Sequence, residues 1–282
     1  MFVRADTLLQ TKVPMPRGNH VIDFEWEEYR PMLFWYVQRD DKADTVPLSE
    51  IDWEVSSTKR CVGRFDHDGY HRCPEAMPVS KFDQCPRCAS AWIEHQQCIF
   101  EPMCNGERCA SGICRKEHTV YMAFFGENAK IGMTTSTRLE GRGIEQGADA
   151  IVPLVRAANR LEGRKAEKGI SQLLRVTQFV PRKKAVALLS GSVSWNRIEQ
   201  IYKEHIDYLS GKYDVLREPL ERLDGYPLKD IGKGKVDLKE TVGRHKGKVV
   251  GLKGKFLVYR DDAGNVSAID MPDLPGRFLS AK

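Results

Sequence analysis

The 282-residue chain lacks several features, and each absence narrows the class of protein. No apolar run approaches the roughly 20 residues that a transmembrane helix needs. The first residues, MFVRADTLLQTKVPMPRG, lack the charged, apolar and small-residue succession of a signal peptide. We therefore expect no membrane contact and a cytoplasmic location, where thiols stay reduced.

Cysteine is absent everywhere except between Cys61 and Cys114, where all 8 cysteines lie. Core cysteines would be scattered along the chain, and a disulfide framework would suit a secreted protein. The segment contains Cys85-Pro-Arg-Cys88, a C-x2-C pair whose two sulfur atoms can face one metal ion. This pattern predicts zinc, with an iron–sulfur cluster and a redox dithiol at Cys85 and Cys88 as the alternatives.

Eight thiolates fit one or two structural zinc sites, because four thiolates close a tetrahedral site. The simplest division follows chain order, with Cys61, Cys73, Cys85 and Cys88 in one site and Cys98, Cys104, Cys109 and Cys114 in the other. His95 or His118 could replace a cysteine in the second site. The spacing leaves no evident open coordination position, so we expect structural rather than catalytic metal.

Composition divides the chain into four parts. We expect an N-terminal β-rich region at 1–60, a cysteine-rich zinc-binding region at 61–118, a core at 119–190, and a basic C-terminal helix plus β-domain at 191–282. The predicted fold class is α+β, with a small mixed sheet, flanking helices and β-rich terminal parts.

Periodicity predicts the individual elements. The runs HVIDFEW and MLFWYVQ read as two strands, and residues 247–270 read as strand, turn and strand. We expect a helix at about 151–175, two short strands around a basic turn at 176–190, and a second amphipathic helix at 195–209.

The formal net charge of +5 is modest, but basic residues gather in two segments. In 156–184 nine cations face Glu162 and Glu167, and the steps Arg156, Arg160, Arg164 and Lys168 predict one basic ridge on a helix. Residues 227–255 carry eight lysines and Arg244 among several glycines. Both segments fit phosphate binding, and the alternatives are a solvated helix face and a flexible, soluble loop.

The stretch VYMAFFGENAKIGMTTSTRLEGRGIEQGAD, residues 120–149, predicts a hairpin with a glycine turn. Its Val120-Tyr121 and Ile131-Gly132 pairs, eleven residues apart, resemble the two halves of the GIY-YIG nuclease motif. In that superfamily an arginine and a metal-binding glutamate follow on helices. The resemblance implies catalytic roles for Tyr121, Arg142 and Glu167, the last with Mg or Mn, and the nearby Lys130 and Arg138 would bind phosphate.

Three positions depart from that motif. Thr119 replaces its first glycine, Lys130 replaces its second tyrosine, and Gln146 replaces its histidine. Each matched residue also has an ordinary structural reading: Tyr121 as a core residue, Arg142 as a cap or ion-pair partner, and Glu167 as the ion-pair partner of an arginine.

A wider resemblance covers most of the chain. A cysteine-rich region, a YxAxFG…KIG hairpin, RGIEQGAD and GLKGKFLVY, in this order, resemble an uncharacterised family of domains of unknown function, number 2797, found in archaea and bacteria and related to GIY-YIG domains.

These patterns favour a zinc-containing protein that binds RNA or DNA through a GIY-YIG-like core. Metal-dependent phosphodiester cleavage is a further possibility, since a carboxylate-bound metal and a cation on the phosphate suit that reaction. The alternatives are a non-catalytic RNA- or ribosome-associated module and a protein-interaction scaffold in which zinc only supports folding.

Overall fold

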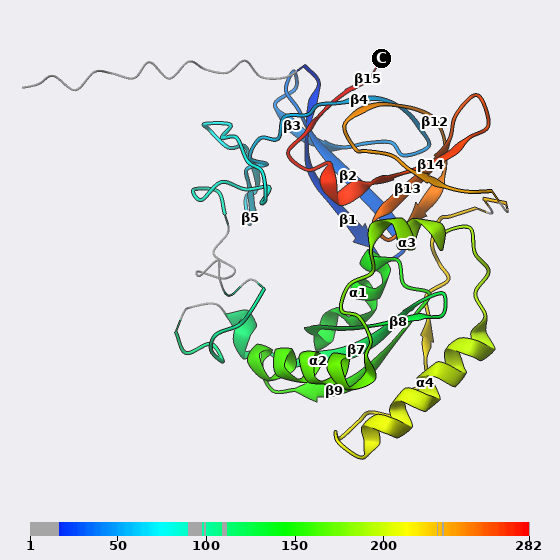
Figure 1. The fold of residues 1–282 in the computed structure, drawn as a ribbon. Helices are drawn as coiled ribbons and strands as arrows, with labels where there is room; N and C mark the ends of the chain where they lie inside the picture. Colours follow the sequence, from blue (N-terminus) through cyan, green and yellow to red (C-terminus); the bar gives the residue numbers. More distant parts are fainter. Residues whose placement is uncertain are drawn as a thin grey trace, which may run out of the picture.

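The computed structural model describes residues 17–89, 98, 100–108, 112–229, 231–232 and 234–281. These residues form a nine-stranded sheet, a four-stranded sheet and a two-stranded hairpin, with helices packed mainly around the four-stranded sheet (Figure 1). The fold is therefore mixed α and β, as the sequence predicted. No helix of the described residues is long and apolar enough to cross a membrane.

The nine-stranded sheet is built from both ends of the chain. Its strand order is β11-β14-β13-β12-β4-β15-β1-β2-β3. The strands are β1 (Asn19–Glu27), β2 (Arg30–Val37), β3 (Lys42–Thr45), β4 (Glu50–Val55), β11 (Asp237–Leu238), β12 (Gly243–Lys253), β13 (Phe256–Arg260), β14 (Val266–Asp270) and β15 (Phe278–Ala281). The N-terminal and C-terminal β-rich parts, which the sequence suggested as separate regions, thus share one sheet, because β4 pairs with both β12 and β15.

The four-stranded sheet carries the hairpin of the central segment. Its order is β10-β9-β7-β8, and its strands are β7 (His118–Phe125), β8 (Asn128–Thr135), β9 (Ala150–Ala157) and β10 (Glu221–Arg222). All eight residues of β7 are buried, because both faces of the sheet are covered. Helices α2 (Arg160–Leu174) and α4 (Trp195–Ser210) cover one face, and α1 (Leu139–Gln146) covers the other.

Residues 151–157, expected to begin a long helix, instead belong to β9. Pro153 cannot donate the hydrogen bond of a helix interior, and the run AIVPLVRA is rich in residues that suit a buried strand. The helix begins later, where the Asn159 side chain caps α2 by accepting from the backbone N–H of Glu162 at 2.9 Å. Arg156 consequently lies exposed on a strand and not on the helical ridge with Arg160.

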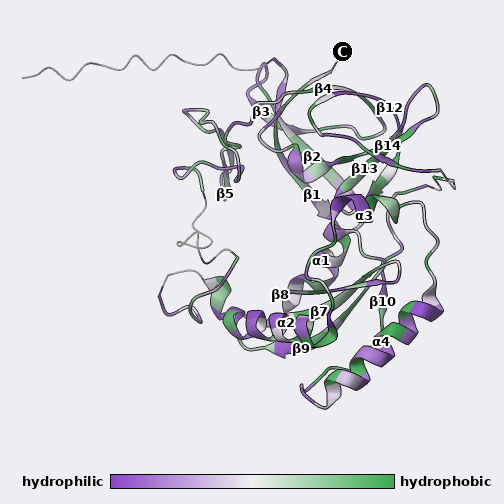
Figure 2. Ribbon diagram, viewed as in Figure 1, coloured by the Kyte–Doolittle hydropathy of each residue, from purple (hydrophilic) through white to green (hydrophobic). Residues whose placement is uncertain are grey.

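The segment 176–190 also differs from expectation. In place of two strands it forms an extended stretch beside β8, where Ile131 donates to the carbonyl of Thr177 at 3.0 Å, and then α3 (Arg182–Ala187). Pro181 stands at the start of α3, followed by helix-forming lysine and alanine. The helix expected at 195–209 is confirmed as α4, which carries hydrophobic and hydrophilic residues on different sides (Figure 2).

The run GKVVGLKGKFLVYR, expected as a single strand, forms two strands joined at Gly254, and this turn packs against the end of α1. Trp26 donates from Nε1 to the Gly254 carbonyl at 2.9 Å, and Tyr226 donates to the Ala148 carbonyl at 2.9 Å. A Cβ atom on Gly254 would lie 2.3 Å from the backbone nitrogen of Gly147. The two sheets are thus joined where the QGAD and GLKGK sequences touch.

Replacing Gly254 with alanine is expected to lower the free energy of unfolding by about 3 kcal/mol, because the added methyl overlaps backbone rather than a movable side chain. The matched control is Gly264→Ala, which also has positive φ (+85°) but no neighbour within 4 Å of the added Cβ. Urea unfolding of both variants measures the difference, and equal losses would show that the sheets do not meet closely at Gly254.

Candidate functional site

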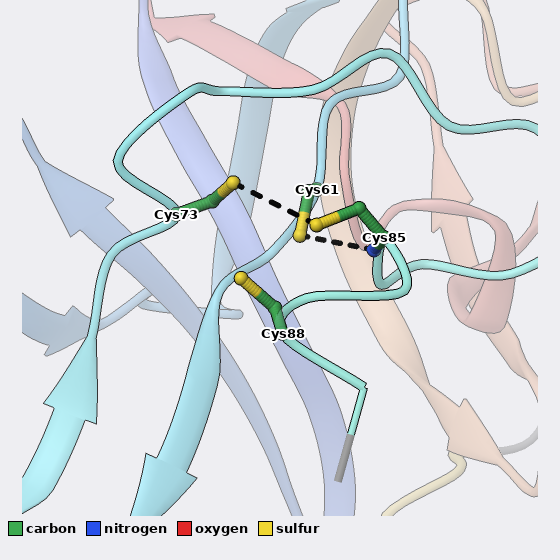
Figure 3. A group of neighbouring side chains, drawn as sticks. All are labelled: Cys61, Cys73, Cys85 and Cys88. Atoms are coloured by element: carbon green, nitrogen blue, oxygen red, sulfur yellow. Dashed lines mark hydrogen bonds between the residues drawn. The ribbon is translucent and has the colours of Figure 1, made fainter.

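Four cysteines come together in the cysteine-rich region. Cys61 follows β4, Cys73 follows the hairpin of β5 (Arg64–Asp66) and β6 (Gly69–His71), and Cys85 and Cys88 share one turn. All four are buried, and their sulfur atoms lie within 4.8 Å of one another. Figure 3 shows the four side chains gathered from these separate stretches of chain.

Backbone N–H groups near these cysteines donate hydrogen bonds to the sulfur atom of Cys61. The backbone N–H groups of Gly63 and Cys85 donate to Cys61 Sγ at 3.4 and 3.2 Å. Gly63 has a φ of +86°, and a Cβ there would lie 2.2 Å from the carbonyl oxygen of His71. The Cys61-Val-Gly63 turn therefore requires glycine both for its conformation and for its close approach to β6.

The sulfur geometry fits a tetrahedral metal. Zinc–sulfur bonds of about 2.3 Å put neighbouring sulfurs about 3.8 Å apart, and Cys73 Sγ lies 4.0 Å from Cys85 Sγ. Burial and then the neighbouring thiols raise the pKa of Cys88 above its usual range, and a bound cation would oppose this shift. These cysteines could hold a metal such as zinc.

The second expected cysteine group is described only in part. Cys109 and His95 lie outside the described residues. Cys98, Cys104 and Cys114 are buried, but among the described residues they do not form a further group within 4.8 Å. The second zinc site therefore stays a prediction.

Part of that second region repeats the local geometry of the first. Cys104 Sγ accepts from the backbone N–H of Gly106 at 3.4 Å, in a Cys-x-Gly turn like that at Cys61. Gly106 also has positive φ, at +102°. His118, named above as a possible replacement for a cysteine, has its Nδ1 atom 2.9 Å from the carbonyl oxygen of Lys116.

The basic residues of α2 contact the cysteine-rich region. Arg160 is buried and donates to Cys114 Sγ at 3.8 Å. Arg164 Nε lies 3.3 Å and Lys168 Nζ 2.7 Å from the carboxylate of Glu101. These three cations attach the helix to the neighbouring segment, whereas Arg156 is exposed on β9.

Tyr121 and Lys130 meet at the hairpin. Tyr121 on β7 pairs with Gly132 on β8, and a Cβ on Gly132 would lie 2.5 Å from the Tyr121 hydroxyl. That hydroxyl accepts from Gln146 Nε2 at 3.0 Å, and Gln146 Oε1 accepts from Lys130 Nζ at 2.5 Å. The glycine therefore makes room for a ring whose hydroxyl is linked through Gln146 of α1 to the lysine.

Arg142 and Glu167 lie near this group. The pKa of Tyr121 is raised by burial, with opposing contributions from Arg142 and Gln146 and a smaller upward one from Glu167. Arg142 donates to Glu145 at 3.0 Å, and Arg138 donates to the same carboxylate at 2.5 Å. Arg142 and Gln146 are thus neighbours of Tyr121, whereas Glu167 is bonded to Arg164 of its own helix.

The structure also shows the ordinary structural roles that the sequence allowed for Tyr121, Glu167 and Arg142. Tyr121 is 1% exposed, as a core residue would be. Glu167 Oε2 accepts from Arg164 at 2.6 Å, and Arg164 is held in turn by Gln178 at 3.0 Å. Arg142 is half-buried and paired with Glu145.

The pKa of Lys130 is lowered toward neutrality. Burial, followed by the positive charge of Arg142, lowers its pKa from 10.5 to about 8, while Glu167 opposes the shift and Lys255 adds slightly to it. Its ammonium group also lies 5.7 Å from the centre of the Tyr121 ring.

A cavity of about 470 Å³ adjoins the cluster. Lys130, Arg142 and Gln146 line it from the four-stranded sheet and α1, and Lys255 and Asp270 line it from the nine-stranded sheet. The basic runs that contain Arg182 and Lys255 can be recognised in the sequence. Their proximity to Lys130 cannot, because no local pattern relates positions so far apart in the chain.

Comparison with known proteins places the chain in a family. Residues 49–273 match the family described as Protein of unknown function (DUF2797). The chain belongs to this family. The matched span includes the four-cysteine group, the hairpin and the GLKGK turn. Searches of curated proteins and of solved structures gave no match.

Proposed function

We propose that this DUF2797 protein binds nucleic acid through a phosphate site at the corner formed by Tyr121, Lys130 and Arg142, beside a structural zinc module. The observation that carries the proposal is the chain of hydrogen bonds from Lys130 through Gln146 to Tyr121, next to a cavity that Lys130, Gln146 and Arg142 line. Half-buried cations at a cavity attract an anion more strongly than fully solvated cations do.

The order of elements supports a GIY-YIG-like core. Tyr121 and Gly132 face each other on a hairpin, Arg142 follows on α1, and Glu167 follows on α2. This is the order in which the nuclease motif supplies its tyrosine, glycine, arginine and glutamate.

Binding is favoured over cleavage by two side chains. Lys130 supplies a cation where the nuclease motif has tyrosine, which suits holding phosphate. Glu167, the residue that would hold Mg or Mn, has one carboxylate oxygen engaged by Arg164. Cleavage stays the second candidate because Tyr121, Arg142 and Glu167 keep the order of the motif, and a divalent ion held by Glu167 would stabilise charge on the phosphate.

Binding to labelled single-stranded RNA and DNA tests the main proposal. We expect an affinity that falls steeply between 50 mM and 200 mM salt, because phosphate contacts release counterions. Absence of binding to both polymers at low salt would contradict the proposal and favour the interaction scaffold.

Incubation of the same polymers with Mg or Mn tests the second candidate. Cleavage should then disappear in Glu167→Ala and Arg142→Ala. Cleavage that persists unchanged in both variants would place the active site elsewhere, and absence of cleavage beside salt-dependent binding would identify a non-catalytic module.

Phosphate affinity is expected to fall as pH rises through about 8, because Lys130 binds the anion as its ammonium form. Arg142, Glu167 and Lys255 are the charged groups that act on Lys130, and Tyr121 stays protonated since its pKa is raised. Lys130→Arg keeps its charge and should flatten the profile between pH 7 and pH 9. The same pH dependence in both proteins would contradict the role of Lys130.

A further inference from the structure

The cavity beside Lys130 lies between two parts of the chain. Gln146, from the RGIEQGAD sequence, lines one side, and Lys255 and Phe256, from GLKGKFLVY, line the other. Arg182 of α3 and Phe179 also line the cavity. The cavity volume of about 470 Å³ is within the range of small-molecule sites.

The charges of the cavity favour an anion. Lys130, Arg142, Arg182 and Lys255 bring four cations to its lining, against the single carboxylate of Asp270. Arg182 binds Asp270 Oδ2 at 3.0 Å and Arg142 pairs with Glu145, which leaves Lys130 and Lys255 without a salt bridge among the described residues. A phosphate group has the charge and the acceptor oxygens that such a lining satisfies.

Aromatic rings form part of the same lining. Phe125 and Phe256 are buried, whereas Phe179 is 63% exposed although it lines the cavity. An exposed phenyl ring at the edge of a basic cavity offers a planar ligand a surface for stacking, as in sites that take single nucleotides.

Asp270 gives the cavity a buried acceptor. The residue is 8% exposed, and its Oδ1 atom has no hydrogen-bond partner within the described residues. Its other oxygen is held by Arg182, whose side chain is 61% exposed and can turn away. Because Oδ1 is enclosed by protein atoms, a ligand N–H group would take the place of Arg182 at Oδ2 and compensate the buried charge there.

We propose that this cavity binds a single nucleotide whose base carries an amino group, with its phosphate at Lys130, Arg142 and Lys255, its base on Phe179, and its amino group at Asp270. The nucleotide is either free or an unstacked unit of a strand. The inference rests on the proposed function in that the phosphate position is the same.

Calorimetric titration with 5′-nucleoside monophosphates tests the proposal. GMP, AMP and CMP should bind at least about tenfold more tightly than UMP, because uracil offers one N–H between two carbonyl oxygens that face the carboxylate unfavourably. Inorganic phosphate should bind more weakly than any of the three, since it cannot stack on Phe179.

Two variants, each with a matched control, separate the contribution of base stacking from that of the amino group. Phe179→Ala should weaken GMP binding about tenfold, whereas Phe100→Ala, at an equally exposed ring (63%) in the cysteine-rich segment, should not. Asp270→Asn should abolish the preference over UMP, because an amide can donate to a uracil carbonyl. Asp237 lies on β11 and forms an exposed ion pair with Lys235, and Asp237→Asn should preserve that preference.

The outcomes distinguish this inference from the proposed function. Salt-dependent binding of RNA or DNA without binding of any monophosphate would overturn the nucleotide cavity and leave the phosphate site intact. Binding of monophosphates without binding of either polymer would support the cavity and overturn the nucleic-acid proposal. Equal affinity for GMP and UMP, or a preference unchanged in Asp270→Asn, would overturn the assignment of Asp270.

Discussion

Replacing Cys88 with serine is expected to remove about one metal ion per chain and to unfold residues 61–88. The buried cluster of this region consists of the four cysteines, with Val79 packed against it, and its hairpin strands have three residues each. Such a segment buries too little apolar surface to fold by itself, so a metal bound by the four cysteines would supply its folding free energy. Residues 119–157, which have their own core, should stay folded.

Elemental analysis and limited proteolysis of the variant measure this result. The matched control is Asp66→Asn, because Asp66, Asp68 and His71 form an exposed group on the adjacent hairpin that could also hold a metal. We expect Asp66→Asn to keep its metal and its protease resistance. Loss of metal from Asp66→Asn with none from Cys88→Ser would contradict the assignment of the cysteines.

Neutralising either member of the Asp149–Lys253 pair is expected to lower the free energy of unfolding by about 3 to 5 kcal/mol. The pair joins the loop after α1 to the last residue of β12. The Asp149 side chain is only 9% exposed and that of Lys253 only 16%. Asp149 also accepts from the backbone N–H of Gly126 at 2.6 Å. Removing one partner leaves the other charge buried without compensation.

A double-mutant cycle with Asp149→Asn and Lys253→Met measures the coupling. Asparagine keeps an acceptor for Gly126, and methionine keeps most of the lysine stem. The double variant should be more stable than the sum of the single losses predicts. The control pair, Lys246 and Asp262, is 54% and 85% exposed and should show coupling near zero. Equal coupling in both pairs would contradict the buried contact between the sheets.

The sequence predicted the features that depend on local pattern. The spacing of the cysteines, with an expected reducing location, grouped four of them correctly: Cys61, Cys73, Cys85 and Cys88. Few other arrangements explain thiols that are confined to one segment. The strands around Phe24 and Phe34 and the helix at 195–209 were also correct, since each has a clear period and a turn or glycine at its end.

Other features depended on contacts that no local pattern contains. The run around Val152 was read as helix because a fully buried strand lacks alternation, and its place between β7 and β10 is set by pairing with both. The pairing of β4 with β12 connects residues almost two hundred positions apart. The position of Lys255 in a cavity beside Lys130 depends on the contact between Gly254 and Gly147, which are also far apart in the sequence.

The salt dependence of single-stranded nucleic-acid binding in Lys130→Met and Arg142→Ala tests the phosphate site most directly. Each variant should reduce the slope of log affinity against log salt by about one, because one phosphate contact is lost. Arg197→Ala on α4, outside the cavity lining, serves as the control and should leave the slope unchanged. Slopes in Lys130→Met and Arg142→Ala equal to that of the unmodified protein would contradict a phosphate site at this corner.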